Sequence, residues 1–147
     1  MTKIKICGIT RLKEIEFINE LQPEYAGFVF AKSRRRISLE QCVTLSEALD
    51  KNIKRVGVFV NEDIENVKKA VKEAGLQVVQ LHGDEDQAYI DSLKGVEVWK
   101  AISVSKTSDV ENAGTYSVQG LVFDSMLDGI RGGTGKSFDW NILKGFT

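Results

Sequence analysis

The sequence has 147 residues, of which 42% are hydrophobic and 28% charged, and its formal net charge at pH 7 is −1. This length suits one domain with a sizeable core, and the balanced charge excludes a general attraction to nucleic acid or anionic membranes. Because no apolar run approaches the roughly 20 residues of a membrane-spanning helix and the first residues lack a signal-peptide pattern, we expect a cytoplasmic protein.

In chain order, short runs of β-branched and apolar residues alternate with longer amphipathic segments. The apolar runs predict strands at residues 3–9, 26–30, 55–60, 78–82, 96–104 and 121–124. The segments between them predict helices at residues 11–21, 39–49, 64–74 and 87–93, with weaker signals near 108–113 and after 139. Six such units indicate an α/β fold with a parallel sheet, which is either an open doubly wound sheet or part of a (β/α)8 barrel.

Two of these helices carry clear start signals. Ser38 has Gln41 three residues further on, which is the spacing of a capping box. Asp63 can cap the helix at 64–74, and Gly75 supplies its end.

Polar or ionisable residues follow every predicted strand. They are Cys7, the basic cluster at residues 32–36, Asn61, Gln80 with His82, Ser103, and Asp124. In parallel α/β folds the carboxyl ends of the strands share one rim, where reacting groups gather. A thiol, a basic cluster, the only histidine and a carboxylate on one rim predict an active site.

Each of these residues also has a structural reading when it is taken alone. Cys7 can be a small core residue, although Gly8 beside it permits close approach of a ligand or backbone. As a base, Cys7 would need nearby cations or amide dipoles that favour its thiolate. Asp124 can brace a loop, or it can act as a general acid if a partly apolar pocket keeps its proton. His82 can equally be a satisfied structural histidine.

The two cysteines and the glycine-rich stretch do not match the spacing of a disulfide framework, a zinc site or a nucleotide-binding loop. Cys7 and Cys42 are far apart without a CxxC pair, so neither a disulfide framework nor a structural zinc site is expected, and we interpret Cys42 as structural. The glycine-rich stretch at residues 129–137 fails the P-loop spacing, because its first glycine lies one residue too early. We interpret it as a flexible active-site loop.

Several segments match a known family in order and spacing. They are KICGIT (residues 5–10), GFVF followed by KSRRRIS (32–38), VGVFVN (56–61), VQLHGDE (79–85), and LVFDS leading to GGTGKSFDW (121–140). Together they run nearly the whole length of the chain. In these segments the sequence resembles the phosphoribosylanthranilate isomerases, and the first and last motifs are the most specific.

The resemblance implies a (β/α)8 TIM barrel and an Amadori rearrangement of a phosphosugar–anthranilate substrate in tryptophan biosynthesis. Asp124 would protonate the furanose ring oxygen, and Cys7 would take the C2′ proton. Arg35 would bind the anthranilate carboxylate, with its neighbours Arg34 and Arg36 as alternatives, and Gln80 and His82 would line the site. The family implies no metal, nucleotide or other cofactor.

The sequence departs from the family pattern after FDWNIL, where family members continue through a seventh and an eighth βα unit that bind the substrate phosphate. We therefore expect residues 1–147 to form one barrel domain with about six of eight βα units. Such a chain would have weak or no activity alone, and its open seam would favour self-association. The alternatives are a non-catalytic, self-associating barrel fragment and a phosphate-ligand-binding or nucleotide-binding α/β protein.

Overall fold

A computed structural model describes residues 2–127, 130–131, 137–144 and 146. Its strands are β1 (Lys5–Cys7), β2 (Tyr25–Val29), β3 (Lys54–Phe59), β4 (Val78–Leu81), β5 (Glu97–Val104), β6 (Gly120–Leu127) and β7 (Ile130–Arg131). Its helices are α1 (Leu12–Leu21), α2 (Leu39–Ala48), α3 (Ile64–Ala74), α4 (Gln87–Asp91), α5 (Thr107–Ala113) and the 3-10 helix η1 (Trp140–Leu143).

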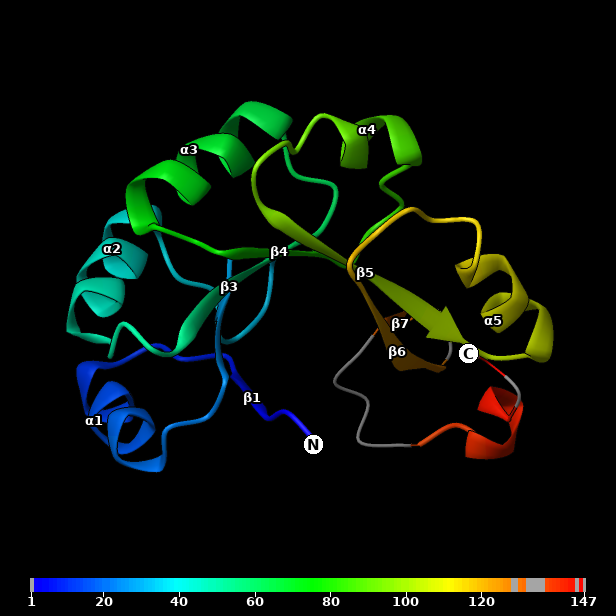
Figure 1. The fold of residues 1–147 in the computed structure, drawn as a ribbon, viewed down its shortest axis with the longest axis horizontal. Helices are drawn as coiled ribbons and strands as arrows, with labels where there is room; N and C mark the ends of the chain where they lie inside the picture. The colour runs from blue at the N-terminus through cyan, green and yellow to red at the C-terminus, as the bar shows by residue number, and fades with distance from the viewer. Residues whose placement is uncertain (1, 128–129, 132–136, 145, 147) are drawn as a thin grey trace.

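The first six strands are parallel and follow one another in sequence order across the sheet. Figure 1 shows them curving into an incomplete barrel with helices on its outer side. A doubly wound sheet would instead reverse its strand order part-way. The prediction of a (β/α)8-type fold with six parallel strands is therefore confirmed, and the open-sheet alternative is wrong.

The helix boundaries have the local causes that the sequence indicated. The side chain of Asp63 accepts a hydrogen bond from the Glu65 amide at 2.8 Å, and Gly75 ends α3 with a φ of 61°. Ser38 likewise accepts from the amide of Gln41 at 3.2 Å. The Gln41 side chain donates to the carbonyl of Thr10 at 2.7 Å, so it fastens α2 to the loop after β1.

The core lies between the outer face of the strands and the helices. Every residue of β4 is buried, as expected for a strand that is covered on both faces. On the inner face, Tyr25 and Trp99 meet edge to face with their ring centroids 4.8 Å apart. These rings fill the amino-terminal end of the half-barrel and leave its carboxyl-terminal rim open for polar groups.

The half-barrel has an open seam between β1 and β6. Among the described residues, β1 pairs only with β2, whereas β6 pairs with β5 and, at its far end, with β7 in antiparallel fashion. A cavity of about 490 Å³ inside the barrel is lined by residues of β1 and β6, including Lys5 and Leu121. The apolar side chains of Leu12, Phe17 and Leu21 on α1 are exposed beside the seam.

The sixth strand is longer than the predicted range of 121–124, because it continues into the pairing with β7. This pairing places Ile130 and Arg131 of the predicted flexible loop in a strand. Residues 129 and 132–136 of that loop lie outside the described residues. In the described part of the chain, no helix has both the length and the apolar character needed to cross a membrane.

Candidate active site

Cys7 ends β1 on the inner face of the barrel, and its side chain is exposed at the rim. The ammonium nitrogen Nζ of Lys5, two residues earlier on the same face, lies 3.4 Å from Cys7 Sγ. Lys5 Nζ also donates to Oε1 of Gln80 on β4 at 2.7 Å. Gln80 is thus buried inside the barrel below the rim, where it bonds to Lys5.

Arg35 is the arginine of the tandem that lies against Cys7. Its Nη1 donates to the Cys7 carbonyl oxygen at 3.3 Å. The Arg35 side chain passes over Gly8, which has a φ of 88° and where any Cβ would collide with Cδ of Arg35. All three arginines are exposed, but Arg36 lines a different cavity, between α2 and α3.

His82 and Asp124 face each other across the rim. His82 Nε2 lies 3.5 Å from Oδ2 of Asp124, and the two side chains are 16% and 31% exposed. This nitrogen is buried and has no hydrogen-bond partner among the described residues. Burial lowers the pKa of His82, the ammonium groups of Lys100 and Lys5 act in the same direction, and Asp124 opposes them. A neutral imidazole next to the Asp124 carboxyl is therefore favoured near neutral pH.

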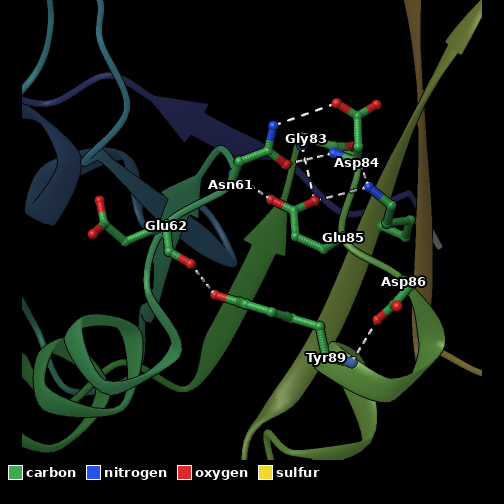
Figure 2. A network of polar contacts seen from close by, with 8 residues as sticks. Asn61, Glu62, Gly83, Asp84, Glu85, Asp86 and Tyr89 are labelled. Atoms are coloured by element: carbon green, nitrogen blue, oxygen red, sulfur yellow. Dashed lines mark hydrogen bonds and ion pairs between the residues drawn. The ribbon is translucent and has the colours of Figure 1, made fainter.

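A buried network holds the loop that carries His82 (Figure 2). The side chains of Glu85 and Lys100 are each only 2% exposed, and Glu85 Oε2 lies 3.0 Å from Lys100 Nζ. Lys100 Nζ also donates to the Gly83 carbonyl at 2.6 Å. The Glu85 carboxylate accepts from the amides of Asn61 at 2.7 Å and Gly83 at 2.9 Å. Asn61 in turn accepts from the Asp84 amide at 2.7 Å.

This network joins the segments that follow β3 and β4 to the middle of β5, which are separate in sequence. The loop is fixed further at its start, where the His82 amide donates to the Phe59 carbonyl at 2.8 Å. It is also fixed at its end, where the Tyr89 hydroxyl donates to the Glu62 carbonyl at 2.9 Å. The imidazole of His82 is consequently presented by a rigid support.

The rim brings a thiol beside an ammonium group and a carboxyl beside a neutral imidazole. The thiol and the carboxyl can therefore move protons at two different positions of one bound substrate. An acid–base isomerisation requires this. Within the described residues, no three histidine, cysteine, aspartate or glutamate side chains are grouped to hold a metal ion.

Comparison with known proteins identifies the family. A sequence model for "N-(5'phosphoribosyl)anthranilate (PRA) isomerase" matches residues 4–147. The chain belongs to this family. The N-(5'-phosphoribosyl)anthranilate isomerase of Thermoanaerobacter sp. (strain X514) is 51% identical over 146 residues, which cover 99% of this chain and 72% of the relative. The enzyme of that name from Clostridium acetobutylicum is 51% identical over 144 residues, 98% of this chain and 70% of its own length.

Solved phosphoribosylanthranilate isomerases have the same fold. The enzyme from Thermotoga maritima superposes with a TM-score of 0.87 at 36% identity, covering 97% of this chain and 70% of that one. A second structure, in complex with reduced 1-(o-carboxyphenylamino)-1-deoxyribulose 5-phosphate, gives a TM-score of 0.85 at 35% identity, with coverages of 98% and 69%. These matches confirm the family predicted from the motifs.

Three residues near the site were not singled out from the sequence. Lys5 carried a usable signal, because residues two apart on a strand share one face and Lys5 precedes Cys7 by two. Glu85 lies within the quoted motif VQLHGDE, but nothing in the sequence pointed to its partner. Lys100 had only the weak signal of a charge within an apolar strand, since its link to Glu85 depends on tertiary structure.

Proposed function

We propose that Cys7 is the general base and Asp124 the general acid of this isomerase. The reaction is the Amadori rearrangement of N-(5-phosphoribosyl)anthranilate to 1-(2-carboxyphenylamino)-1-deoxyribulose 5-phosphate in tryptophan biosynthesis. The observation that carries the assignment is the contrast between their surroundings. Cys7 Sγ lies beside an ammonium group, whereas Asp124 faces an imidazole whose pKa burial lowers.

The reaction needs one proton donor and one proton acceptor. Asp124 protonates the furanose ring oxygen while the anthranilate nitrogen lone pair forms a C=N bond at C1′, so the ring C–O bond breaks and a Schiff base results. Cys7 then removes the proton from C2′, and the electrons of that C–H bond form the C1′=C2′ bond of an enolamine. Tautomerisation of the enolamine gives the ketone. Proton transfer by positioned groups accelerates such steps by about 10²–10⁴-fold.

The remaining rim residues bind and orient the substrate. Arg35 is placed beside Cys7, and its guanidinium group can bind the anthranilate carboxylate through two hydrogen bonds. His82 offers a buried nitrogen without a partner in the described structure, which suits a substrate hydroxyl. Gln80 anchors Lys5 and lines the cavity inside the barrel.

The test is a fluorescence assay that follows the loss of phosphoribosylanthranilate. Cys7→Ala and Asp124→Asn should each lower turnover by about 10²–10⁴-fold and retain binding of the reduced product analogue by calorimetry. Cys42→Ala is the matched control, because Cys42 is buried in α2 away from the rim. Unchanged turnover in either rim variant would remove that residue from the proposed mechanism.

The assay is run on the 147-residue chain and on a fusion to the part of the Thermoanaerobacter relative beyond the matched region. Strands from that segment would cover the seam between β1 and β6, so we expect the fusion to be the more active protein. Equal turnover of the two proteins at the level of full-length relatives would contradict this expectation.

We also propose that the protein acts in the cytoplasm and that the isolated chain self-associates through its seam. The exposed side chains of Leu12, Phe17 and Leu21 support this association, as does the edge of β1 that has no strand partner among the described residues. A related enzyme from Thermotoga maritima is described as dimeric. Sedimentation velocity should give a species larger than the 16.4 kDa chain, and a compact monomer would contradict the proposal.

A further inference from the structure

Lys5 is a half-buried cation inside the barrel that no carboxylate neutralises in the described structure. Lys54, Lys68 and Lys100 each form an ion pair with a glutamate at 3.0 Å or less. The bonded partners of Lys5 Nζ are instead the neutral amide of Gln80 at 2.7 Å and the sulfur of Cys7 at 3.4 Å. Of these two partners, only Cys7 can become an anion.

The backbone of β2 provides the space for this contact. Gly27 is the Cα partner of Cys7 in the parallel pairing of β1 and β2. A Cβ on Gly27 would lie 2.7 Å from Cys7 Sγ and 3.1 Å from Cε of Lys5. Gly27 therefore leaves room for the thiol and the lysine stem side by side, while Gln80, only 5% exposed, holds the ammonium from the opposite strand.

Among the charged groups around the thiol, Lys5 is the one whose charged atom contacts the sulfur, at 3.4 Å. From the loop after β2, the Arg35 guanidinium bonds to the carbonyl oxygen of Cys7. From α1 comes the Glu14 carboxylate, which pairs with Arg11. The loop after β4 brings the imidazole of His82, and β5 brings the ammonium of Lys100, which Glu85 neutralises. From β6, the Asp124 carboxyl faces His82. Lys5 is thus the cation in direct contact with the sulfur.

We propose that Lys5 is a positioning residue whose ammonium group holds the Cys7 sulfur and stabilises the negative charge that the sulfur carries when it reacts. A cation in contact with a sulfur favours the thiolate over the thiol. The significance of this effect for catalysis rests on the proposed role of Cys7 as base, but the electrostatic effect itself does not.

The experiment measures how fast iodoacetamide alkylates Cys7 between about pH 5 and pH 10, because only the thiolate reacts. Alkylation is quantified on the peptide that contains Cys7. Cys42 does not interfere, since it is buried and burial raises its pKa to about 11. The alkylation rate is measured without turnover of substrate, so it does not depend on how active the chain is.

Lys5→Met removes the charge and retains a long side chain. We expect alkylation at pH 7 to slow several-fold and the whole pH profile to move to higher pH. Lys5→Arg should restore most of the wild-type profile. Lys3→Met is the matched control, because Lys3 lies two residues earlier on the same strand side, is exposed and makes no contact with the sulfur. A Lys5→Met profile that superimposes on the wild-type profile would overturn the proposal.

A second variant covers the case in which Lys5→Met fails to fold. Gln80→Leu keeps the charge but removes the acceptor that anchors it, so the midpoint should rise by a smaller amount. An unchanged midpoint in this variant would count against the proposal in the same way. Circular dichroism establishes that each variant used is folded.

Turnover separates this inference from the role of Cys7. If Cys7→Ala keeps full turnover while Lys5→Met shifts the alkylation midpoint, the base assignment fails and the electrostatic inference stands. If Cys7→Ala abolishes turnover and Lys5→Met leaves alkylation unchanged, the inference fails and the base assignment stands. If both hold, Lys5→Met should lower kcat and leave the affinity for the reduced product analogue nearly unchanged.

Discussion

The two sides of the rim are supported in very different ways. On the β4 side, the loop that carries His82 is fastened by the Glu85–Lys100 pair, by the bonds of these two side chains to backbone groups, and by the backbone bond from His82 to Phe59 of β3. On the β1 side, Cys7 is exposed and is held by the side chains of Lys5 and Arg35. One side is fixed by buried groups, and the other by long, partly exposed side chains.

This difference suits the tasks proposed for the two sides. The imidazole of His82 can accept a hydrogen bond from a substrate hydroxyl only if it stays neutral and in one place. Burial and a rigid loop provide both conditions. Cys7 must instead reach a carbon of the substrate and lose its proton, and an exposed thiol beside a cation meets both requirements. The comparison predicts that damage to the β4 side costs stability and that damage to the β1 side costs chemistry.

The largest expected effect on stability comes from Lys100→Met. Removal of this ammonium leaves the Glu85 carboxylate buried without its counter-charge, which destabilises the fold by about 3–5 kcal/mol. Urea unfolding followed by circular dichroism measures the change. The matched control is Lys54→Met, which breaks an ion pair that is 47% exposed at Lys54 and should cost at most about 1 kcal/mol.

A double variant, Glu85→Leu with Lys100→Met, sharpens the same test. It removes both charges, so it should be more stable than Lys100→Met alone if the unpaired carboxylate is the cause. The amides of Asn61 and Gly83 then lose their acceptor, so recovery should be partial. Equal stability of Lys100→Met and Lys54→Met would mean that the β4 side is no more firmly held than the surface.

The sequence predicted which residues lie on the rim better than it predicted the contacts that hold them there. Strand ends converge in any parallel α/β fold, so Cys7, His82 and Asp124 could be placed together from the strand pattern alone. The start and end of α3 followed from Asp63 and Gly75, whose capping is local. The structure places Cys7 at the end of β1, Gln80 on β4, and Asp124 on β6 opposite His82, and the roles of these residues remain predictions.

The features that sequence reasoning missed depend on contacts between distant segments. Lys100 meets Glu85 because β4 and β5 are neighbours, and no periodicity records which lysine and which glutamate will pair. The tandem arginines look alike in sequence. They differ in structure because the Arg36 backbone bridges to Val29 while the Arg35 side chain passes over Gly8. A motif can locate such residues but does not supply their partners.

The smallest expected effect is the pH dependence of stability contributed by His82, the only histidine of the chain. Burial lowers its pKa in the folded protein, whereas in the unfolded chain it titrates near its usual value of about 6.5. As the pH falls below about 6.5, the unfolded chain therefore binds more protons than the folded protein. The stability that the neutral imidazole contributes is present above this pH and is lost as the pH falls toward the lowered pKa.

Urea midpoints at about pH 7.5 and pH 5.5 for the wild type and His82→Gln measure this contribution, because few other side chains titrate in that interval. The wild type should lose more stability on acidification than the variant. A wild type that instead gains stability relative to His82→Gln would mean that attraction by Asp124, 3.5 Å away, outweighs burial. His82 would then be a cation that pairs with the acid, and the contrast between a neutral, rigid β4 side and a charged β1 side would no longer hold.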